Sequence, residues 1–484
     1  MEFPLSQSAL PTSTSTVSPP RPHRRSRHRV ALAIIVTCQL MLILDATVMN
    51  VALPRIQRDL HFSATGLAWV LNAYTLTFGG LLLLGGRAGD LFGRRRMFVA
   101  GITLFTAASL AGGFAPTAGW LLAARVLQGV GAAAAGPSTI ALITTTFTEP
   151  RERIRALAVL SGIASAGFAI GLIVGGVVTE AASWRWVLFV NVPFGVAAVV
   201  LAPRFVREPE RHPGRLDVPG AVVATAAAAS LVYAFLHAAA SGWSQWRTMA
   251  ALGAGIVLLA VFVAMQARGR RPLLPLRLFA DRNRAAAYLA FFLAPAGMMS
   301  SFFFLTQFLQ EVRGLSALAT GLAFLPLAAA MFTMTRLVPR LLPRFGPKPL
   351  VLTGSALMVA GLALLTPLSP GGGYAAALLG PLVLLGLGGG LGLAPLTPVI
   401  MASVQAADAG AAGGALQTMQ QVGASLGLAV LVTVFGTAVR NAGAVSPHQA
   451  LVTGMDTAFA VAAGIAAAVV LVALTFRRQQ AEVR

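Results

Sequence analysis

A single carboxylate interrupts the first long apolar run of this 484-residue sequence. Asp45 lies in the stretch Leu44–Pro54, near the far end of an apolar run that begins at Val30. Near the centre of a membrane-spanning helix an aspartate costs about 2.5 to 3.5 kcal/mol on an insertion scale. It therefore needs an opposite charge, a water-filled cavity or a bound proton. We take Asp45 as the first candidate functional residue.

An arginine in a later apolar run is predicted to lie at the depth of Asp45. Asp45 follows Arg29 by sixteen residues, which places it about 24 Å from the inner edge at about 1.5 Å per residue. Arg125 follows Trp120 in a span that runs inward, about 22 Å from the inner edge of a core about 30 Å thick. Our hypothesis is that both charges face one central cavity, where Arg125 lowers the proton affinity of Asp45. A permanent structural ion pair is the alternative.

The composition places these charges in a membrane protein. Apolar residues make up 57% of the chain and charged residues only 11%, whereas charged residues approach about 25% in soluble domains. The formal charge of +21 fits either a nucleic-acid partner or arginine-rich cytoplasmic loops. Cys38 is the single cysteine, so an internal disulfide is excluded.

Fourteen apolar runs are long enough to cross a bilayer at about 20 residues each. They predict an all-α fold with two six-helix pseudo-repeats and two extra central helices. The runs lie at 30–51, 67–86, 97–115, 120–144, 156–178, 186–203, 218–238, 249–266, 285–307, 317–338, 349–367, 374–398, 413–438 and 454–476. The predicted parts are a disordered basic tail (1–29), a first bundle (30–203), a linker (204–217), the extra helices (218–266), a second linker (267–284), a second bundle (285–476) and a tail (477–484).

The basic residues alternate with the spans. With the N-terminus inside, cytoplasmic segments hold 29 of the 36 Lys and Arg residues. This bias predicts a multi-pass protein of the inner (plasma) membrane with both termini cytoplasmic, and it explains the net charge without nucleic acid. A cleaved signal peptide is the rival interpretation of the N-terminus, but the apolar run is long and the stretch from Asp45 to Pro54 supplies no small-residue cleavage site.

Several energy sources and chemistries are excluded by sequence. A nucleotide-binding loop needs Lys followed by Ser or Thr, and Lys348, the only lysine, precedes Pro349. The histidines form no metal-hydrolase motif, and no haem-attachment motif is present. We therefore expect no enzyme activity, no metal and no cofactor. An ion-driven carrier or a passive channel remains, and the buried titratable groups favour the carrier.

Further polar and aromatic residues are second-rank candidates. A phenylalanine-rich span and a glutamine-bearing span are predicted to supply a substrate cavity, through Phe304, Gln307, Phe308, Gln417, Gln420 and Gln421. Phenylalanines that pack between helices or face lipid are the alternative. Asp408 and Asp456 fall near span ends, where a carboxylate stays hydrated, and are candidate proton or cation sites.

Two loops repeat across the halves of the chain. The loop 86–96 follows the second span, and a degenerate counterpart, 340–348, follows the second span of the later six. Repeated halves with a site between them are typical of alternating-access carriers.

These features together resemble the fourteen-span drug:proton antiporters of the major facilitator superfamily, over nearly the whole chain after the tail. Four stretches carry the resemblance: Leu44–Pro54, Gly85–Arg96, Arg125–Gly131 and Ser183–Pro193. The resemblance implies a conformational-switch loop with Gly86, Asp90, Gly93, Arg94 and Arg95, and a span 4 motif with Gln128 and Gly129. Asp90 is expected to pair with the arginines that follow it.

The span 5 motif departs from the family pattern. Its glycines are kept at Gly167, Gly171, Gly175 and Gly176, but Leu172 stands where the family has a proline. Small residues at this spacing allow close helix approach. The bend that the proline is thought to give is therefore not expected from the sequence.

The resemblance implies proton-coupled export of hydrophobic or amphipathic drugs by a monomer in the bilayer. With one clearly intramembrane acid, neutral or monocationic compounds are favoured over dications. Export of the cell's own antibiotic and ion-coupled uptake of a polar nutrient are the alternatives.

Overall fold

The computed structural model describes residues 22–476 except 210–215, 270–271, 369–370, 372, 403, 406–407 and 443–445. In this part of the chain fourteen helices are long and apolar enough to cross a membrane, and no strand occurs. The predicted all-α membrane fold is therefore confirmed. The predicted tail 477–484 lies outside the described residues.

The first six spans contain seven helices. They are α1 (Pro22–Leu60), α2 (Ala68–Phe92), α3 (Arg94–Gly113), α4 (Ala118–Thr146), α5 (Pro150–Ala181), and α6 (Trp186–Phe189) followed by α7 (Asn191–Phe205). The two extra spans are α8 (Val218–Ser241) and α9 (Trp246–Arg268).

The second linker is partly folded and leads into the last six spans. The linker holds the 3₁₀ turn η1 (Leu276–Phe279). The spans are α10 (Arg282–Gln307) with the π-helical turn η2 (Phe308–Val312), α11 (Ala317–Ala323) with α12 (Leu325–Phe345), α13 (Pro347–Leu364), the π-helical turn η3 (Ala375–Leu379) with α14 (Gly380–Leu393) and α15 (Leu396–Met401), α16 (Ala409–Asn441) and α17 (Pro447–Leu474).

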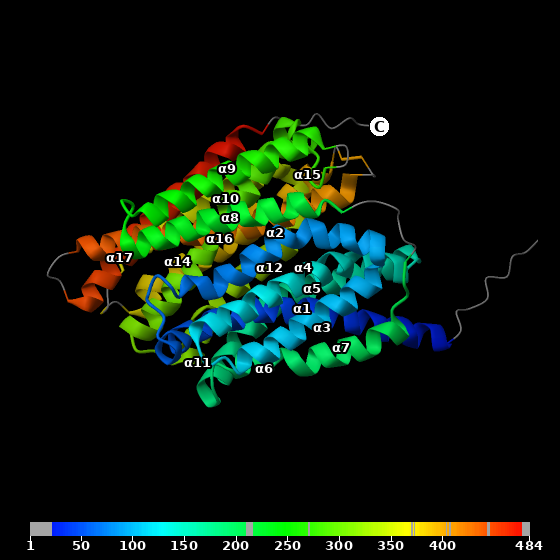
Figure 1. Cartoon of the computed structure of the whole chain (residues 1–484), viewed down its shortest axis with the longest axis horizontal. Coiled ribbons are helices and arrows are strands. Elements are labelled where there is room, and N and C mark those ends of the chain that lie inside the picture. The colour runs from blue at the N-terminus through cyan, green and yellow to red at the C-terminus, as the bar shows by residue number, and fades with distance from the viewer. Residues whose placement is uncertain are drawn as a thin grey trace, which may run out of the picture.

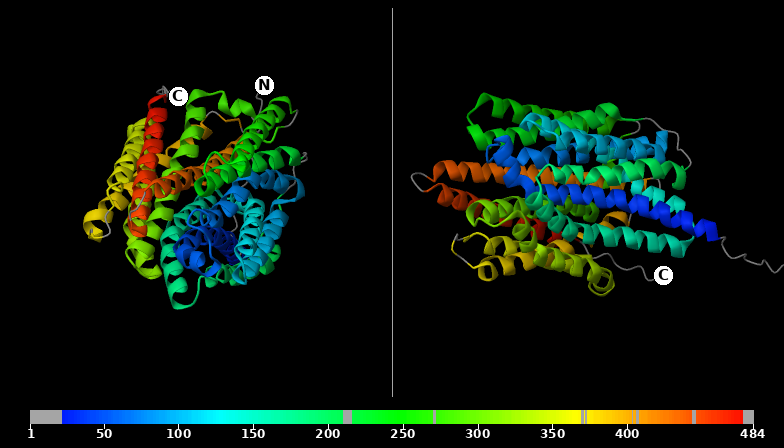
Figure 2. Two further views of the ribbon diagram at one scale, coloured as in Figure 1. Left: turned by 60° about the vertical axis from the view of Figure 1, so that its left-hand side comes forward. Right: turned by 90° about the horizontal axis from the view of Figure 1, so that it is seen from below.

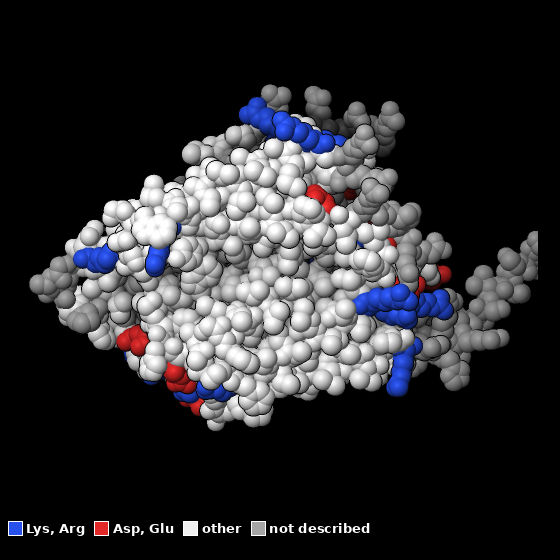
Figure 3. All heavy atoms as spheres, in the orientation of Figure 1, with Lys and Arg blue, Asp and Glu red and all other residues white. Residues whose placement is uncertain are grey.

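The helices run side by side in two groups. The left view of Figure 2 shows α1 to α7, in blue to blue-green, on one side and the yellow to red helices of the second group on the other, whereas the two groups overlap in Figure 1 and in the right view of Figure 2. α8 packs between α2 of the first group and α16 of the second, and α9 packs on α8. On the face seen in Figure 3, charged side chains lie toward the helix ends and an uncharged band separates them.

Helix α1 begins earlier than the sequence predicts. Residues 22–29 were expected in a disordered tail, but α1 starts at Pro22 and these residues are helical. Contacts account for the difference, since the His28 ring lies 5.3 Å from that of Phe147 and its Nδ1 is 3.3 Å from a Glu152 carboxylate oxygen.

Corresponding turns in the two groups have the same backbone signature. Gly93 between α2 and α3 has φ +107°, and Gly346 between α12 and α13 has φ +74°. These angles are accessible to glycine and strained for other residues. A cation follows two residues later in each case. Arg95 donates to carbonyls of Pro203 and Val206 at the end of α7.

Lys348 makes the corresponding hydrogen bonds in the second group. Its Nζ donates to the carbonyls of Leu474 and Phe476, at 2.8 and 2.9 Å, at the end of α17. In both groups the turn after the second span thus caps the C-terminal end of the last span, where a cation is favourable. This shared device extends the loop repeat seen in the sequence.

Candidate functional site

Asp45 of α1 and Arg125 of α4 form a buried ion pair. Arg125 Nη1 lies 2.5 Å from Asp45 Oδ2, and the two side chains are 1% and 0% exposed. The depth count that placed both charges at one level agrees with this contact. Since taking two charges out of water costs several kcal/mol per ion, such a pair persists only with further hydrogen bonds around it.

Those hydrogen bonds come from α4 itself and from two further helices, α2 and α7. Asp45 Oδ1 accepts from Gln128 Nε2 at 2.9 Å and from Asn191 Nδ2 of α7 at 3.1 Å. Arg125 donates through Nε to the Val70 carbonyl of α2 at 3.1 Å and through Nη1 to Gln128 Oε1. The Asp45 carboxyl group is therefore held by three donors, and four spans meet at it.

The pair lies behind the cavity wall, which corrects the expectation that both charges face a central cavity. Tyr74 of α2 lines the cavity, and the Arg125 guanidinium carbon lies 4.5 Å from the centre of the Tyr74 ring. Asp45 and Arg125 are not among the lining residues. The guanidinium is drawn inward by Val70, Gln128 and Asp45, which leaves the aromatic face between the charges and the cavity.

The cavity itself lies between the two helix groups and has a volume of about 1340 Å³. Its inner wall mixes apolar side chains with polar ones, among them Thr47, Asn50, Phe168, Phe302 and Gln421. Asn50 Oδ1 is buried and has no hydrogen-bond partner among the described residues. A buried acceptor without a partner is costly, so a ligand donor or water at this point is favourable.

The cavity opens toward the end of the molecule that carries the basic loops, here called the basic end. Arg87, Asp90 and Arg94 of the switch loop, and Asp217, Arg277 and Asp408 opposite, line this mouth. Arg87 and Arg277 side chains are 42% and 69% exposed, so the mouth reaches the surface.

The other end of the molecule is closed where α5 meets α11 and α1 meets α10. Glu180 of α5 accepts from the Leu318 backbone N–H at 3.0 Å, and Gly176 approaches Leu318 so closely that an added Cβ would lie 2.7 Å from its Cα. Gln310 of η2 donates to the Val51 carbonyl of α1 at 2.9 Å. In this structure the cavity is therefore open at the basic end and closed at the opposite end.

The predicted substrate-cavity residues separate into three groups. Gln417 and Gln421 line the cavity, and Gln420, on the same helix, does not. The prediction that Phe304 and Phe308 line the cavity is wrong: neither is among its lining residues, both are fully buried, and the Phe304 ring packs tilted against Phe435 and edge-on against Phe459.

Gln307 faces elsewhere. It lines a second, smaller pocket at the end opposite the basic loops, and its Nε2 is 3.4 Å from the Phe303 carbonyl. The prediction that it lines one cavity with the phenylalanines is therefore wrong.

The switch loop turns on Gly93 and pairs its charges locally. Arg94 Nη2 lies 2.6 Å from Asp90 Oδ1, and Arg87 Nη1 lies 3.8 Å from Asp90 Oδ2. The Glu208 carboxylate of the first linker accepts from the Arg95 backbone N–H at 3.0 Å, in the first turn of α3. A carboxylate there is favoured by the helix dipole. Gly86 lies at the cavity wall.

The glycines of spans 4 and 5 are points of close helix contact. A Cβ at Gly129 would lie 2.8 Å from the Tyr74 carbonyl oxygen, while Gly167, Gly171 and Gly175 place α5 against α1 at Leu40, Thr47 and Val48. α5 is one continuous helix through Leu172, which is buried. The span 5 motif therefore sets the distance between α5 and α1, the helix that carries Asp45.

The second-rank acids are both partnered. Asp408 forms a two-point ion pair with Arg277, at 2.8 and 2.9 Å, and these hydrogen bonds to Asp408, together with its charge, raise the pKa of the Arg277 guanidinium. Asp408 is largely buried, which differs from the expected hydrated position. Asp456 accepts from the Leu368 backbone N–H at 3.3 Å.

Sequence reasoning missed three residues of this site. Asn191 was noted only as part of a signature, Asn50 only as part of the first stretch, and Tyr74 not at all. An asparagine or tyrosine in an apolar span is a usable signal, because a buried amide needs a partner. Which partner it finds depends on helix packing across up to 146 residues of chain.

Comparison with known proteins agrees with this architecture. Residues 35–428 match the family described as Major Facilitator Superfamily. The chain is 42% identical over 436 residues to a puromycin resistance protein of Streptomyces alboniger, covering 88% of this chain and 85% of that protein. It is 40% identical to a cephamycin export protein of Amycolatopsis lactamdurans, covering 86% and 87%.

A solved structure shares the fold. A peptide transporter POT in complex with sulfate superposes with a TM-score of 0.64, at 14% identity, covering 92% of this chain and 93% of that one. At this identity the likeness concerns the fold alone.

Proposed function

This chain belongs to the Major Facilitator Superfamily and is a drug-efflux transporter, and on that premise we propose that it exchanges amphipathic compounds for protons across the plasma membrane. The observation that carries the proposal is the buried Asp45–Arg125 pair beside a large cavity of mixed polarity. Export then requires only the proton gradient and the compound, without a cofactor or a chemical conversion.

Asp45 is the proton-binding group in this mechanism. Its ionised form is matched to three donors, whereas a protonated carboxyl would give up one acceptor position and leave the Arg125 guanidinium without its counter-charge. Relief of that imbalance requires Arg125 to move, and Arg125 lies against the ring of Tyr74 in the cavity wall. Protonation in α1 is thereby coupled to the shape of the cavity.

Compound binding acts on the same helix from the other side. Thr47 and Asn50 line the cavity within two turns of Asp45, and Asn50 offers an unmatched acceptor. A compound that fills the cavity therefore competes with the proton-bound arrangement of α1. Exchange requires that proton binding and compound binding weaken each other in this way.

The cavity charges define the class of compound. The acids in the cavity wall, Asp90, Asp217 and Asp408, lie at the mouth, and each has a hydrogen-bond or ion-pair partner. The deeper wall is uncharged and offers amides and hydroxyls. This combination favours neutral or monocationic amphipathic compounds, taken from outside or made by the cell itself.

The orientation follows from the basic loops. Because 29 of the 36 Lys and Arg residues fall on one side, the basic end and the cavity mouth face the cytoplasm, with both termini. The protein then takes up compound from inside, as a monomer whose two helix groups enclose the whole cavity.

Drug panels and everted vesicles test the proposal. Expression in a pump-deficient host should raise tolerance to puromycin, cephamycin or another amphipathic antibiotic, and everted vesicles acidified inside should accumulate that compound until an ionophore collapses the gradient. Accumulation in vesicles that survives collapse of the proton gradient would contradict proton exchange, and tolerance to no compound of the panel would contradict export.

A further inference from the structure

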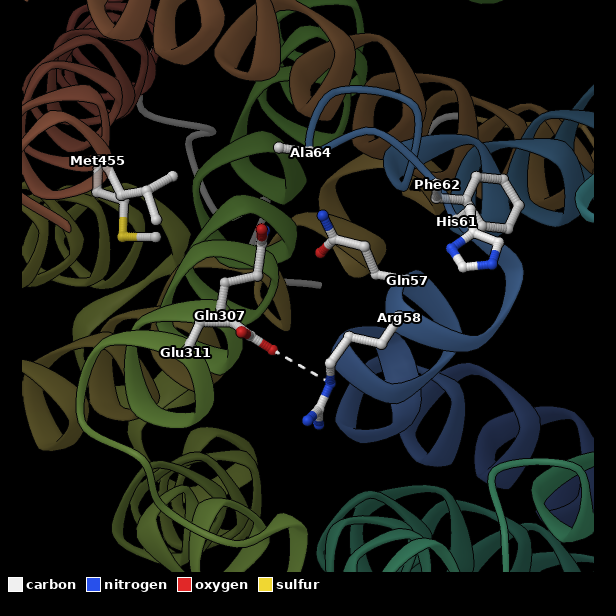
Figure 4. A pocket seen from close by; sticks show the side chains of 9 residues that line it. Gln57, Arg58, His61, Phe62, Ala64, Gln307, Glu311 and Met455 are labelled. Atoms are coloured by element: carbon white, nitrogen blue, oxygen red, sulfur yellow. Dashed lines mark ion pairs between the residues drawn. The ribbon is translucent and has the colours of Figure 1, made fainter. Parts of the chain in front are cut away.

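A second pocket lies at the end opposite the cavity mouth. It has a volume of about 470 Å³ and is lined by residues of α1, of α10 with η2, and of α17. Figure 4 shows Gln57 and Arg58 from one wall and Gln307 and Glu311 from the other, directed toward the space between them. The volume falls within the range of about 300 to 1,000 Å³ typical of ligand sites.

Both walls rest on irregular backbone. His61, just beyond α1, has φ 54°, the one described non-glycine residue in the left-handed region. Across the pocket, α10 changes into the π-helical turn η2, which carries Glu311. Left-handed non-glycine residues and π-helical turns both concentrate at functional sites. Two of them face one pocket here.

The pocket offers polar groups with spare hydrogen-bonding capacity. Arg58 Nε and Glu311 Oε1 are 3.8 Å apart, which is an ion pair but exceeds hydrogen-bond distance. Their side chains are 65% and 37% exposed, so the pocket is reached from the aqueous phase. The amides of Gln57 and Gln307 stand beside them, and Phe62, Leu451 and Met455 supply an apolar wall.

The same two helices line both cavities. On α1, Thr47 and Asn50 face the central cavity and Gln57 the outer pocket. On α10, Phe302 faces the central cavity and Gln307 the outer pocket, with fully buried Phe303 and Phe304 between. The parts of α1 and α10 between the two cavities are closed against each other, and the hydrogen bond that Gln310 donates to the Val51 carbonyl helps to hold them together.

We propose that the outer pocket is a second binding site for the exported compound, which occupies it after α1 and α10 part. The inference rests on the export function proposed above. The Glu311 carboxylate, the two amides and the apolar wall fit the neutral or monocationic amphipathic class that the central cavity also favours, with Arg58 as a further hydrogen-bond donor.

Cysteine protection tests the site directly. Gln57→Cys in the full chain is labelled from outside with a membrane-impermeant thiol reagent, since native Cys38 is buried, and Ala64→Cys, a partly exposed position in the same pocket, gives a second reporter. Puromycin is the probe. At about ten times its Kd, a bound probe should slow labelling about tenfold. Labelling of Gly119→Cys, an exposed control with nothing within 4 Å of its Cβ, should be unaffected.

Two variants separate occupancy from an indirect effect. Gln307→Ala, in the outer pocket, should lower protection from about tenfold to about threefold, as expected for the loss of one hydrogen bond, and Gln417→Ala, in the central cavity, should leave it intact. Protection lost in Gln417→Ala and kept in Gln307→Ala would overturn the inference, as would export of a probe without protection at either reporter. Failure to export any compound in the tolerance panel would instead overturn the export function.

Discussion

Replacing Asp45 with Asn should destabilise the folded protein far more than replacing an exposed acid on the same helix. The change leaves the Arg125 guanidinium, 1% exposed, without its counter-charge. Removing one partner of a buried pair costs about 3 to 5 kcal/mol. Asp59→Asn is the matched control, because the Asp59 side chain is 51% exposed, its 3.8 Å pair with Arg185 is worth about 0 to 1 kcal/mol, and the amide oxygen of Asn can still accept the 2.8 Å hydrogen bond from Trp184 Nε1.

The double variant shows whether charge is the cause. In Asp45→Asn with Arg125→Gln both charges are gone, so most of the loss should be recovered, with a coupling energy of about 2 to 3 kcal/mol. Titration of the purified protein with SDS in mixed micelles measures the free energy of unfolding of the wild type, the single variants Asp45→Asn and Arg125→Gln, the double variant and the Asp59→Asn control. Equal stability of Asp45→Asn and the wild type would refute the reasoning, because it would mean that the carboxyl is uncharged in this state.

Three further predictions concern the cavity, the core and the turn. Gln417→Ala should weaken equilibrium binding of an exported compound by about 1 kcal/mol, as for one hydrogen bond, whereas Gln420→Ala, outside the cavity wall, should leave the Kd unchanged. Phe304→Ala should lower stability by about 3 to 5 kcal/mol in the same SDS titration while the Kd is retained, because the ring is core and not cavity; a large change in Kd with unchanged stability would reverse that assignment. Gly93→Ala should cost about 1 to 3 kcal/mol, since its φ is +107° and an added Cβ would lie 2.6 Å from Glu208 Oε1, and Gly119→Ala should cost much less.

The helices and the central pair of Asp45 and Arg125 could be predicted from the sequence, because both follow from counting residues along the helix axis. Apolar length fixes the spans, and 1.5 Å per residue fixes the depth of Asp45 and Arg125. The glycines at 167, 171 and 175 likewise indicate a close helix contact. The partner, α1, was not predictable from their spacing, which describes only one side of the contact.

The sequence does not show how each helix is rotated about its own axis, and therefore which of its residues face the cavity. A run such as Phe302–Phe304 has apolar residues on every side, so no periodicity distinguishes cavity, core and lipid. Three consecutive residues point in different directions, and only Phe302 reaches the cavity. Gln417 and Gln420 differ for the same reason. Asp408 was misjudged because its partner Arg277 lies in a linker, in the η1 turn of four residues, which is too short to show a helical periodicity.

Coupling between Asp45 and the proton gradient is the central claim, and transport by purified protein in proteoliposomes tests it most directly. Two modes are compared in the wild type and in Asp45→Asn: uptake driven by a pH gradient, and exchange of labelled for unlabelled compound without a gradient. Exchange shows that the variant is folded and binds compound, which separates loss of coupling from loss of stability.

The account predicts that Asp45→Asn loses gradient-driven uptake and retains exchange. Gradient-driven uptake at the wild-type rate in Asp45→Asn would contradict it.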